Sequence, residues 1–184
     1  GGQRRRVILL GSASLIGGIT GGVLLLTLPS SVFDAVVPVL ILLAVALVIV
    51  QPRLSRVVAE RRSRVVEHGG FELWIGIFLT GIYGGYFGAA QGVILLALLG
   101  IFIAENLQRL NAVKNVLALI ANGVAAVLFV FFADVNWTIV VLIAVGSVVG
   151  AQLGAHVGRR LPAGALRAVI VVVGLVAAVK LLVT

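Results

Sequence analysis

Long apolar runs joined by short polar links constrain this chain more than any other feature of its sequence. Five runs of about 20 residues contain few charges: Val7–Leu28, Val32–Val50, Ala112–Phe132, Trp137–Val157 and Gly164–Leu182. An α-helix of that length crosses the hydrocarbon core of a bilayer, and it satisfies its own backbone hydrogen bonds there. The sequence therefore predicts an all-α, polytopic transmembrane helix bundle.

The composition limits the chemistry that such a bundle can perform. Charged residues are 11% of the chain, whereas a soluble domain has about 25%. The absence of cysteine excludes disulfides, thiolate metal sites and cysteine nucleophiles. His68 and His156 have no carboxylate at ligand spacing, and Ser147 lies about 13 Å from His156 along one helix axis. We therefore expect no metal, no cofactor and no enzymatic activity.

The net charge of +8 is interpreted as a signal of membrane topology rather than of nucleic-acid binding, since Lys and Arg collect in cytoplasmic links. The run Phe71–Ile103 is too long for one span and short for two. If it enters the membrane and returns, every Lys and Arg except Lys180 falls on one side. We therefore predict a re-entrant-type helical hairpin at 71–103. The arginine-rich loop 51–70 is predicted to be cytoplasmic, in a protein of the cell membrane.

The stretch Gly81–Gly92, at the tip of this predicted hairpin, holds five glycines in twelve residues. Each glycine costs a helix about 1 kcal/mol relative to alanine, and a membrane helix breaks only where protein or a water-lined cavity receives the freed backbone groups. A half-helix that begins there offers free N–H groups and a positive dipole end, which suit an anion. The alternative is that the glycines only permit close helix packing.

Polar residues near the tip complete a predicted site for a small anionic solute. Asn111, Asn115 and Asn122 share one helical face, and Lys114 is available to pair with solute, with Glu105 or with lipid headgroups. Gln91 is equally suited to a structural hydrogen bond, and Tyr86 to a place in the interfacial aromatic belt. The predicted substrate-binding residues are Gly84, Gly85, Tyr86, Gly88, Gln91, Gly92, Lys114, Asn115 and Asn122.

Gln152 and His156 are four residues apart and are candidates for proton coupling, because histidine titrates near neutral pH. A solvated histidine near the end of a helix is the simpler interpretation of His156.

The chain also contains an internal repeat. A shift of 133 positions superposes Ser14, Gly17, Gly21, Leu28 and Pro29 on Ser147, Gly150, Gly154, Leu161 and Pro162. The link 27–34 carries no positive residue whereas the link 158–167 carries three arginines, so the two copies are predicted to be inverted in the membrane. Residues 1–50 would then be the last two helices of a first repeat, 51–70 a basic loop, and 71–184 the second repeat. The hairpin of the first repeat is expected about 60 residues upstream of Gly1, in a part that this chain lacks.

These motifs resemble the TauE/SafE family of membrane transporters, which includes sulfite and organosulfonate exporters. The resemblance covers nearly the whole chain and is carried by Gly81–Gly92, by Asn111-Ala112-Val113-Lys114-Asn115 and by the glycine series from Gly146 to Pro162. The family usually has three consecutive glycines at the tip, where this chain has Gly88-Ala89-Ala90-Gln91-Gly92, and a second glycine-rich tip near the N terminus, which is absent here. The resemblance implies transport of small sulfur-containing anions.

Inverted repeats with broken helices are typical of secondary transporters. We therefore expect a bilayer-embedded transporter that moves a small anion by alternating access. Two alternatives are a passive anion channel and a non-transporting scaffold that assembles through GxxxG faces; such faces also leave homo-oligomerisation open.

Overall fold

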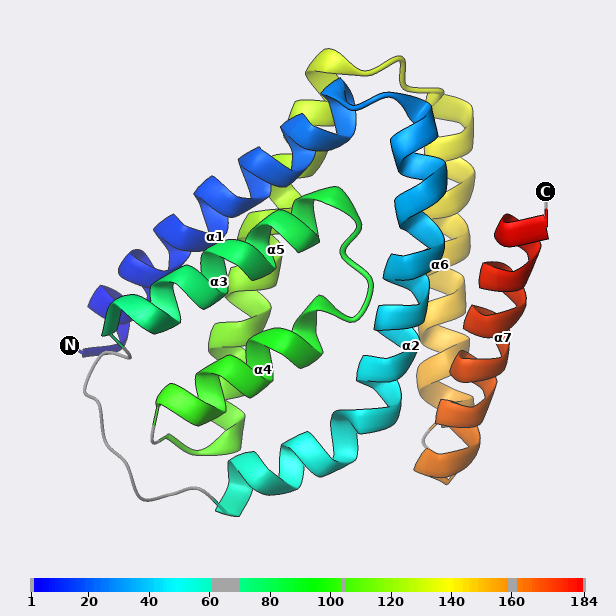
Figure 1. Cartoon of the computed structure of the whole chain (residues 1–184). Coiled ribbons are helices and arrows are strands. Elements are labelled where there is room, and N and C mark those ends of the chain that lie inside the picture. The colour runs from blue at the N-terminus through cyan, green and yellow to red at the C-terminus, as the bar shows by residue number, and fades with distance from the viewer. Residues whose placement is uncertain (1, 61–69, 104, 159–161, 184) are drawn as a thin grey trace.

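The computed structural model describes residues 2–60, 70–103, 105–158 and 162–183, and within those ranges it contains only α-helices and their links (Figure 1). The helices are α1 (Gly2–Thr27), α2 (Ser30–Glu60), α3 (Gly70–Tyr86), α4 (Gln91–Phe102), α5 (Leu107–Phe132), α6 (Trp137–Gly158) and α7 (Ala163–Val183). Among these described helices, α1, α2, α5 and α6 are long and apolar enough to cross a membrane. The predicted all-α bundle of membrane helices is confirmed.

Helix α2 continues to Glu60, ten residues beyond the apolar run that ends at Val50. The extension includes Pro52, which lacks an N–H group and crowds the preceding turn of the helix. Figure 1 shows α2 bending toward α4 in its second half, as expected where proline interrupts the hydrogen-bond ladder. The predicted basic loop 51–70 is thus helical in its first half, and its residues 61–69 lie outside the described ranges.

The core is formed by α1, α3, α4 and α5, and α2 packs against α4 and α7. Buried side chains from all four core helices meet in one cluster of Leu10, Ala13, Leu73, Ile77, Leu95, Leu99, Ile103, Leu110, Val113 and Leu117. Helix α6 is different, because every residue from 137 to 154 is exposed. The core therefore holds the predicted hairpin between α1 and α5.

Close contact between α1 and α3 explains part of the glycine density. A Cβ atom on Gly17 would lie 2.9 Å from the Cα atom of Gly81, and one on Gly85 would lie 3.0 Å from the backbone of Gly18. On the neighbouring side of α1, the Ser14 hydroxyl donates to the Leu117 carbonyl oxygen at 2.6 Å. Gly81 and Gly85 thus permit helix packing, which is the alternative interpretation of these two glycines.

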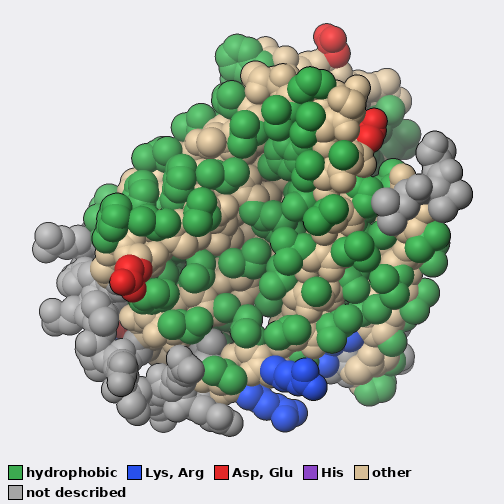
Figure 2. Space-filling view, in the orientation of Figure 1, with side chains coloured by type: hydrophobic (Ala, Val, Ile, Leu, Met, Phe, Trp, Pro, Cys, Tyr) green, Lys and Arg blue, Asp and Glu red, His purple; other side chains and the backbone are tan. Residues whose placement is uncertain are grey.

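Helices α3 and α4 form a hairpin whose tip points toward α2 (Figure 1). From the tip, α4 runs back toward the end of the molecule at which α2 ends. Helix α4 has 12 residues and is therefore about 18 Å long, shorter than the hydrocarbon core of about 30 Å. Figure 2 shows hydrophobic side chains over most of this face, with Lys and Arg gathered at the end where α2 ends. The re-entrant position of the hairpin in the membrane stays a prediction.

Candidate functional site

The break between α3 and α4 spans residues 87–90, inside the glycine-rich stretch. The N–H groups of Phe87 and Gly88 both donate to the Tyr83 carbonyl oxygen at 2.9 Å. Gly88 has φ of 76° and Ala90 has φ of 58°, a left-handed conformation that glycine adopts without strain and alanine does not. The Tyr83 hydroxyl donates to the Ala89 carbonyl oxygen at 2.5 Å. These bonds within the chain hold the tip in one shape.

Helix α4 begins at this tip without a side-chain cap, and the N–H groups of Gln91 and Val93 donate to the Gly88 and Ala90 carbonyl oxygens at 3.3 and 2.9 Å, which leaves the Gly92 N–H as the donor of the first turn. Its N-cap residue is Ala90, which makes no side-chain hydrogen bond to the helix. The first N–H groups of any α-helix lack partners within the helix, and the aligned peptide dipoles give that end a partial positive charge. The start of α4 is therefore suited to an electron-rich group.

The side chain of Lys114, on α5, lies beside the first turn of α4. A Cβ atom on Gly92 would be 3.5 Å from Cδ and 3.8 Å from Nζ of Lys114. Glu105 forms an ion pair with Arg109 at 3.2 Å, and within the described part of the chain Lys114 has no ion pair. A lysine ammonium and the positive end of a helix thus lie side by side, an arrangement that a bound anion would stabilise.

Asn122 lies two turns further along α5, beside the tip itself. Its Oδ1 atom would be 3.4 Å from a Cβ atom on Gly88. The structure therefore brings together Gly88, Gly92, Lys114 and Asn122, four of the residues predicted from sequence. All four lie on the α4–α5 side of the tip.

Gln91 is buried, with 2% of its surface exposed, and it joins the two halves of the hairpin. Its Nε2 group donates to the Thr80 carbonyl oxygen at 3.3 Å. A Cβ atom on Gly84 would lie 2.6 Å from its Oε1 atom, so the amide occupies the space that a side chain at position 84 would need. This geometry matches the structural alternative for Gln91. Thr80, which sequence reasoning missed, gave no signal beyond being a polar residue within an apolar run.

The contact between Gly84 and Gln91 predicts a strong coupling between the two positions. Gly84→Ala should destabilise the protein by about 2 kcal/mol, because the new methyl group collides with the buried amide. In a Gln91→Ala background the collision is gone, so the same change should cost much less and, through helix propensity, become stabilising by up to about 1 kcal/mol. Unfolding of the four proteins in mixed micelles measures the coupling. Equal effects of Gly84→Ala in both backgrounds would contradict the described packing.

Other predicted residues lie apart from this cluster. Gly85 contacts α1, as described above, and Asn115 is exposed on α5 two turns before Asn122. The Tyr86 ring lies 6.4 Å from that of Phe33 on α2, and its hydroxyl is buried without a hydrogen-bond partner among the described residues. Gln152 and His156 are exposed on α6.

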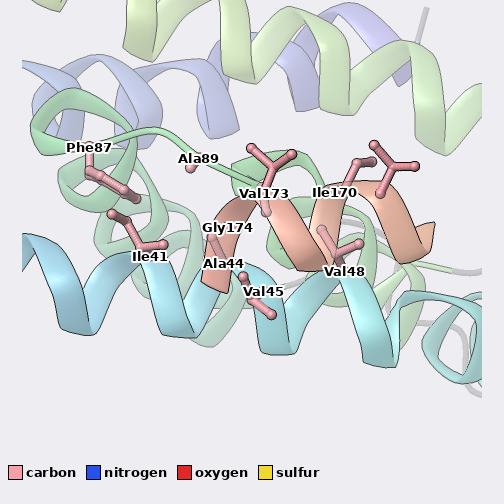
Figure 3. A pocket seen from close by; sticks show the side chains of 11 residues that line it. Ile41, Ala44, Val45, Val48, Phe87, Ala89, Ile170, Val173 and Gly174 are labelled. Carbon is pink, nitrogen blue, oxygen red and sulfur yellow. The ribbon is translucent and has the colours of Figure 1, made fainter. Parts of the chain in front are cut away.

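An apolar cavity of about 390 Å³ lies between the tip, α2 and α7 (Figure 3). The tip contributes Phe87, Ala89 and Ala90 to its wall, and the two helices contribute Ile41, Ala44, Val45, Val48, Val169, Ile170, Val173 and Gly174. None of these residues offers a polar side chain, so the cavity by itself does not suit an anion. The polar groups lie beside Gly88 and Gly92, where α4 meets α5.

A family model described as "Sulfite exporter TauE/SafE" matches residues 1–181. The chain belongs to the TauE/SafE family. The resemblance inferred from the glycine-rich motifs is confirmed, and with four candidate membrane spans among its described helices this TauE/SafE chain is a multi-pass membrane protein.

Curated relatives carry similar names. The chain is 28% identical over 170 residues to "Probable membrane transporter protein ORF9" of Sinorhizobium sp, a match that covers 92% of this chain and 63% of the relative. It is 27% identical to a "Probable membrane transporter protein" of Haemophilus influenzae, over 76% of this chain and 53% of the relative. It is 26% identical to "Probable membrane transporter protein YfcA" of Escherichia coli K12, over 97% of this chain and 67% of the relative. This TauE/SafE chain thus spans between about half and two thirds of the length of these relatives. No solved structure matches it.

Proposed function

We propose that this protein transports a small anion, of the sulfite or organosulfonate kind, by alternating access. The observation that carries the proposal is the position of Lys114 beside the uncapped start of α4. The family's description supports the choice of sulfite, and the relatives' names support transport.

The chemistry of the cluster favours an oxyanion. The ammonium of Lys114 supplies a full charge, and the Gly92 N–H supplies a hydrogen-bond donor beside it at the positive end of α4. The amide of Asn122 adds a neutral group beside Gly88, at the far end of the cluster. A small oxyanion has several acceptor oxygens and can use the ammonium and the backbone donors together, whereas a cation would be repelled by both.

Alternating access is supported by the place of the cluster within the bundle. The hairpin is held between α1 and α5, and the repeated sequence pattern indicates two related halves, between which transporters of this kind bind their solute. We also propose that the end of the bundle with Arg53 and Arg56 faces the cytoplasm, because positive residues resist translocation.

The proposal is tested with the whole gene product reconstituted in liposomes. Uptake of radiolabelled sulfite should saturate with concentration, and liposomes preloaded with unlabelled sulfite should take it up faster, since a carrier exchanges solute across the membrane. An equal uptake of glycerol by liposomes with and without protein controls for leaks. Flux that rises linearly without acceleration by preloading would favour a channel. Absence of sulfite flux in correctly folded protein would contradict the proposal and favour the scaffold.

A further inference from the structure

The apolar cavity between the tip, α2 and α7 has the size and chemistry of a site for an apolar chain. Its volume is about 390 Å³, and none of its lining residues has a polar side chain. Figure 3 shows Ile41 and Val48 of α2 pointing toward α7 and the tip. Water needs several polar partners in order to occupy a cavity, whereas apolar molecules bind in such spaces readily. Inside a bilayer, the apolar chains at hand are those of the lipids.

The contact between α2 and α7 fixes how the residues of the two helices align. The helices run in opposite directions (Figure 1), and a Cβ atom on Gly174 would lie 2.5 Å from Cγ2 of Val45. Arg56 follows Val45 by 11 residues, and Arg167 precedes Gly174 by 7 residues. At 3.6 residues per turn, each arginine lies on the face of its helix that carries the contact residue. Both arginines lie on the same side of the contact, so the two helices present them at one end of the cavity.

The bend of α2 opens this end of the cavity. Beyond Pro52, α2 turns toward α4 and diverges from α7 (Figure 1). The side chain of Arg56 is exposed there and that of Arg167 is half-buried, and Arg53 adds another exposed guanidinium one turn earlier. Among the residues that the structure describes, none of these arginines forms an ion pair. Guanidinium groups bind phosphate through paired N–H donors, so this end of the cavity suits a phosphate.

The spacing between the helix contact and the arginines matches one leaflet of a bilayer. Arg56 lies about 16 Å beyond Val45 along the helix, and half of the hydrocarbon core is about 15 Å thick. A phospholipid with its phosphate between Arg56 and Arg167 would therefore lay an acyl chain along the cavity as far as Phe87 and Ala89 of the tip. A soluble anion would contact only the arginines, and an uncharged apolar molecule only the cavity. An anionic lipid uses both.

We propose that the cavity between α2 and α7 binds an anionic phospholipid, with its phosphate at Arg56 and Arg167 and one acyl chain against the apolar wall. Basic pockets between membrane helices bind the head groups of anionic lipids in this way. The end of the acyl chain packs on Phe87 and Ala89, which flank Gly88, so the lipid supports the tip of the hairpin. The proposal does not depend on which solute is transported.

Cross-linking with a photoreactive lipid tests the proposal in the whole gene product. The probe is a phosphatidylglycerol with a diazirine near the end of one acyl chain, added to liposomes of phosphatidylcholine. Irradiation should label Ala44 and Val45, which line the cavity and are buried. The same diazirine chain on phosphatidylcholine should label these two residues about tenfold less, because its head group carries no net charge. Equal labelling by the two lipids, or labelling confined to the exposed faces of α6 and α7, would overturn the proposal.

Two variants, each of which removes one positive charge, locate the head group. In Arg167→Gln protein, labelling of Ala44 and Val45 by the phosphatidylglycerol probe should fall about fivefold. In the control Arg109→Gln, the lost charge belongs to the exposed side chain that pairs with Glu105 on the surface of the molecule, so labelling should change by less than about twofold. An equal decrease in both variants, or none in Arg167→Gln, would show that the phosphate does not bind between α2 and α7.

Discussion

Replacing Lys114 with methionine is expected to lower sulfite uptake at low concentration by about 100-fold, which corresponds to about 3 kcal/mol of lost binding free energy. Methionine has nearly the reach of lysine but carries no charge. The anion beside the start of α4 would keep the Gly92 N–H and the positive helix end and would lose the charge of Lys114. Initial rates in liposomes, at sulfite concentrations well below and well above saturation, measure the effect on KM and on the maximal rate.

Two further variants separate charge at the site from charge at the membrane surface. Lys114→Arg keeps a cation beside Gly92 and should retain most of the uptake. Arg109→Gln removes a charge from the exposed side chain that pairs with Glu105, and it should change uptake by less than about twofold because surface ion pairs contribute little. If Lys114→Met takes up sulfite like the unmodified protein, the anion does not bind at this cluster.

Replacing Gly21 with alanine is expected to disrupt the packing of α1 against α3 and to destabilise the protein. In Gly21→Ala the new Cβ atom would lie 2.8 Å from the Tyr86 nitrogen and 3.0 Å from the Gly85 carbonyl carbon, and it would also meet the Ile82 carbonyl oxygen. All three are backbone atoms within a helix, so none can rotate away as a side chain would. We expect a loss of about 3 kcal/mol in the free energy of unfolding, measured by denaturation in mixed micelles.

Gly123 on α5 provides the matched control for this change. A Cβ atom there would meet nothing within 4 Å, so Gly123→Ala should stabilise its helix by up to about 1 kcal/mol through propensity. The two substitutions are chemically identical and should act in opposite directions. A loss of stability at Gly123 equal to that at Gly21 would mean that the α1–α3 contact is not the cause.

Several features of the fold followed from the sequence because their causes are local. Runs such as Trp137–Val157 are long and apolar enough to make membrane helices wherever they pack, and the structure contains that helix as α6. The glycine-rich stretch predicted a break, and the break occurs at residues 87–90. The extension of α2 to Glu60 was not predicted, since an apolar run marks the span and not the end of the helix, which here continues through Pro52.

The sequence predicted which residues lie at the candidate site, but it did not predict what each of them does there. Spacing alone placed Asn122 and Lys114 near the hairpin, and the structure puts them beside Gly88 and Gly92. The sequence could not distinguish a glycine that binds from one that packs, because every glycine looks alike in sequence. Gly85 packs on α1, whereas Gly88 adopts a left-handed conformation.

By itself, the sequence determined that this chain forms membrane helices, that one of its apolar runs breaks at a glycine-rich stretch, and that it belongs to the TauE/SafE family. Hydrophobic length, glycine density and residue motifs are properties of short stretches, so the sequence carries them directly. Only the tertiary structure decided that Gln91 fills the space above Gly84 and that Lys114 lies beside the start of α4. Those contacts join segments that are distant in the chain, and their geometry depends on how closely the glycine-bearing backbones of α1, α3 and α5 approach one another.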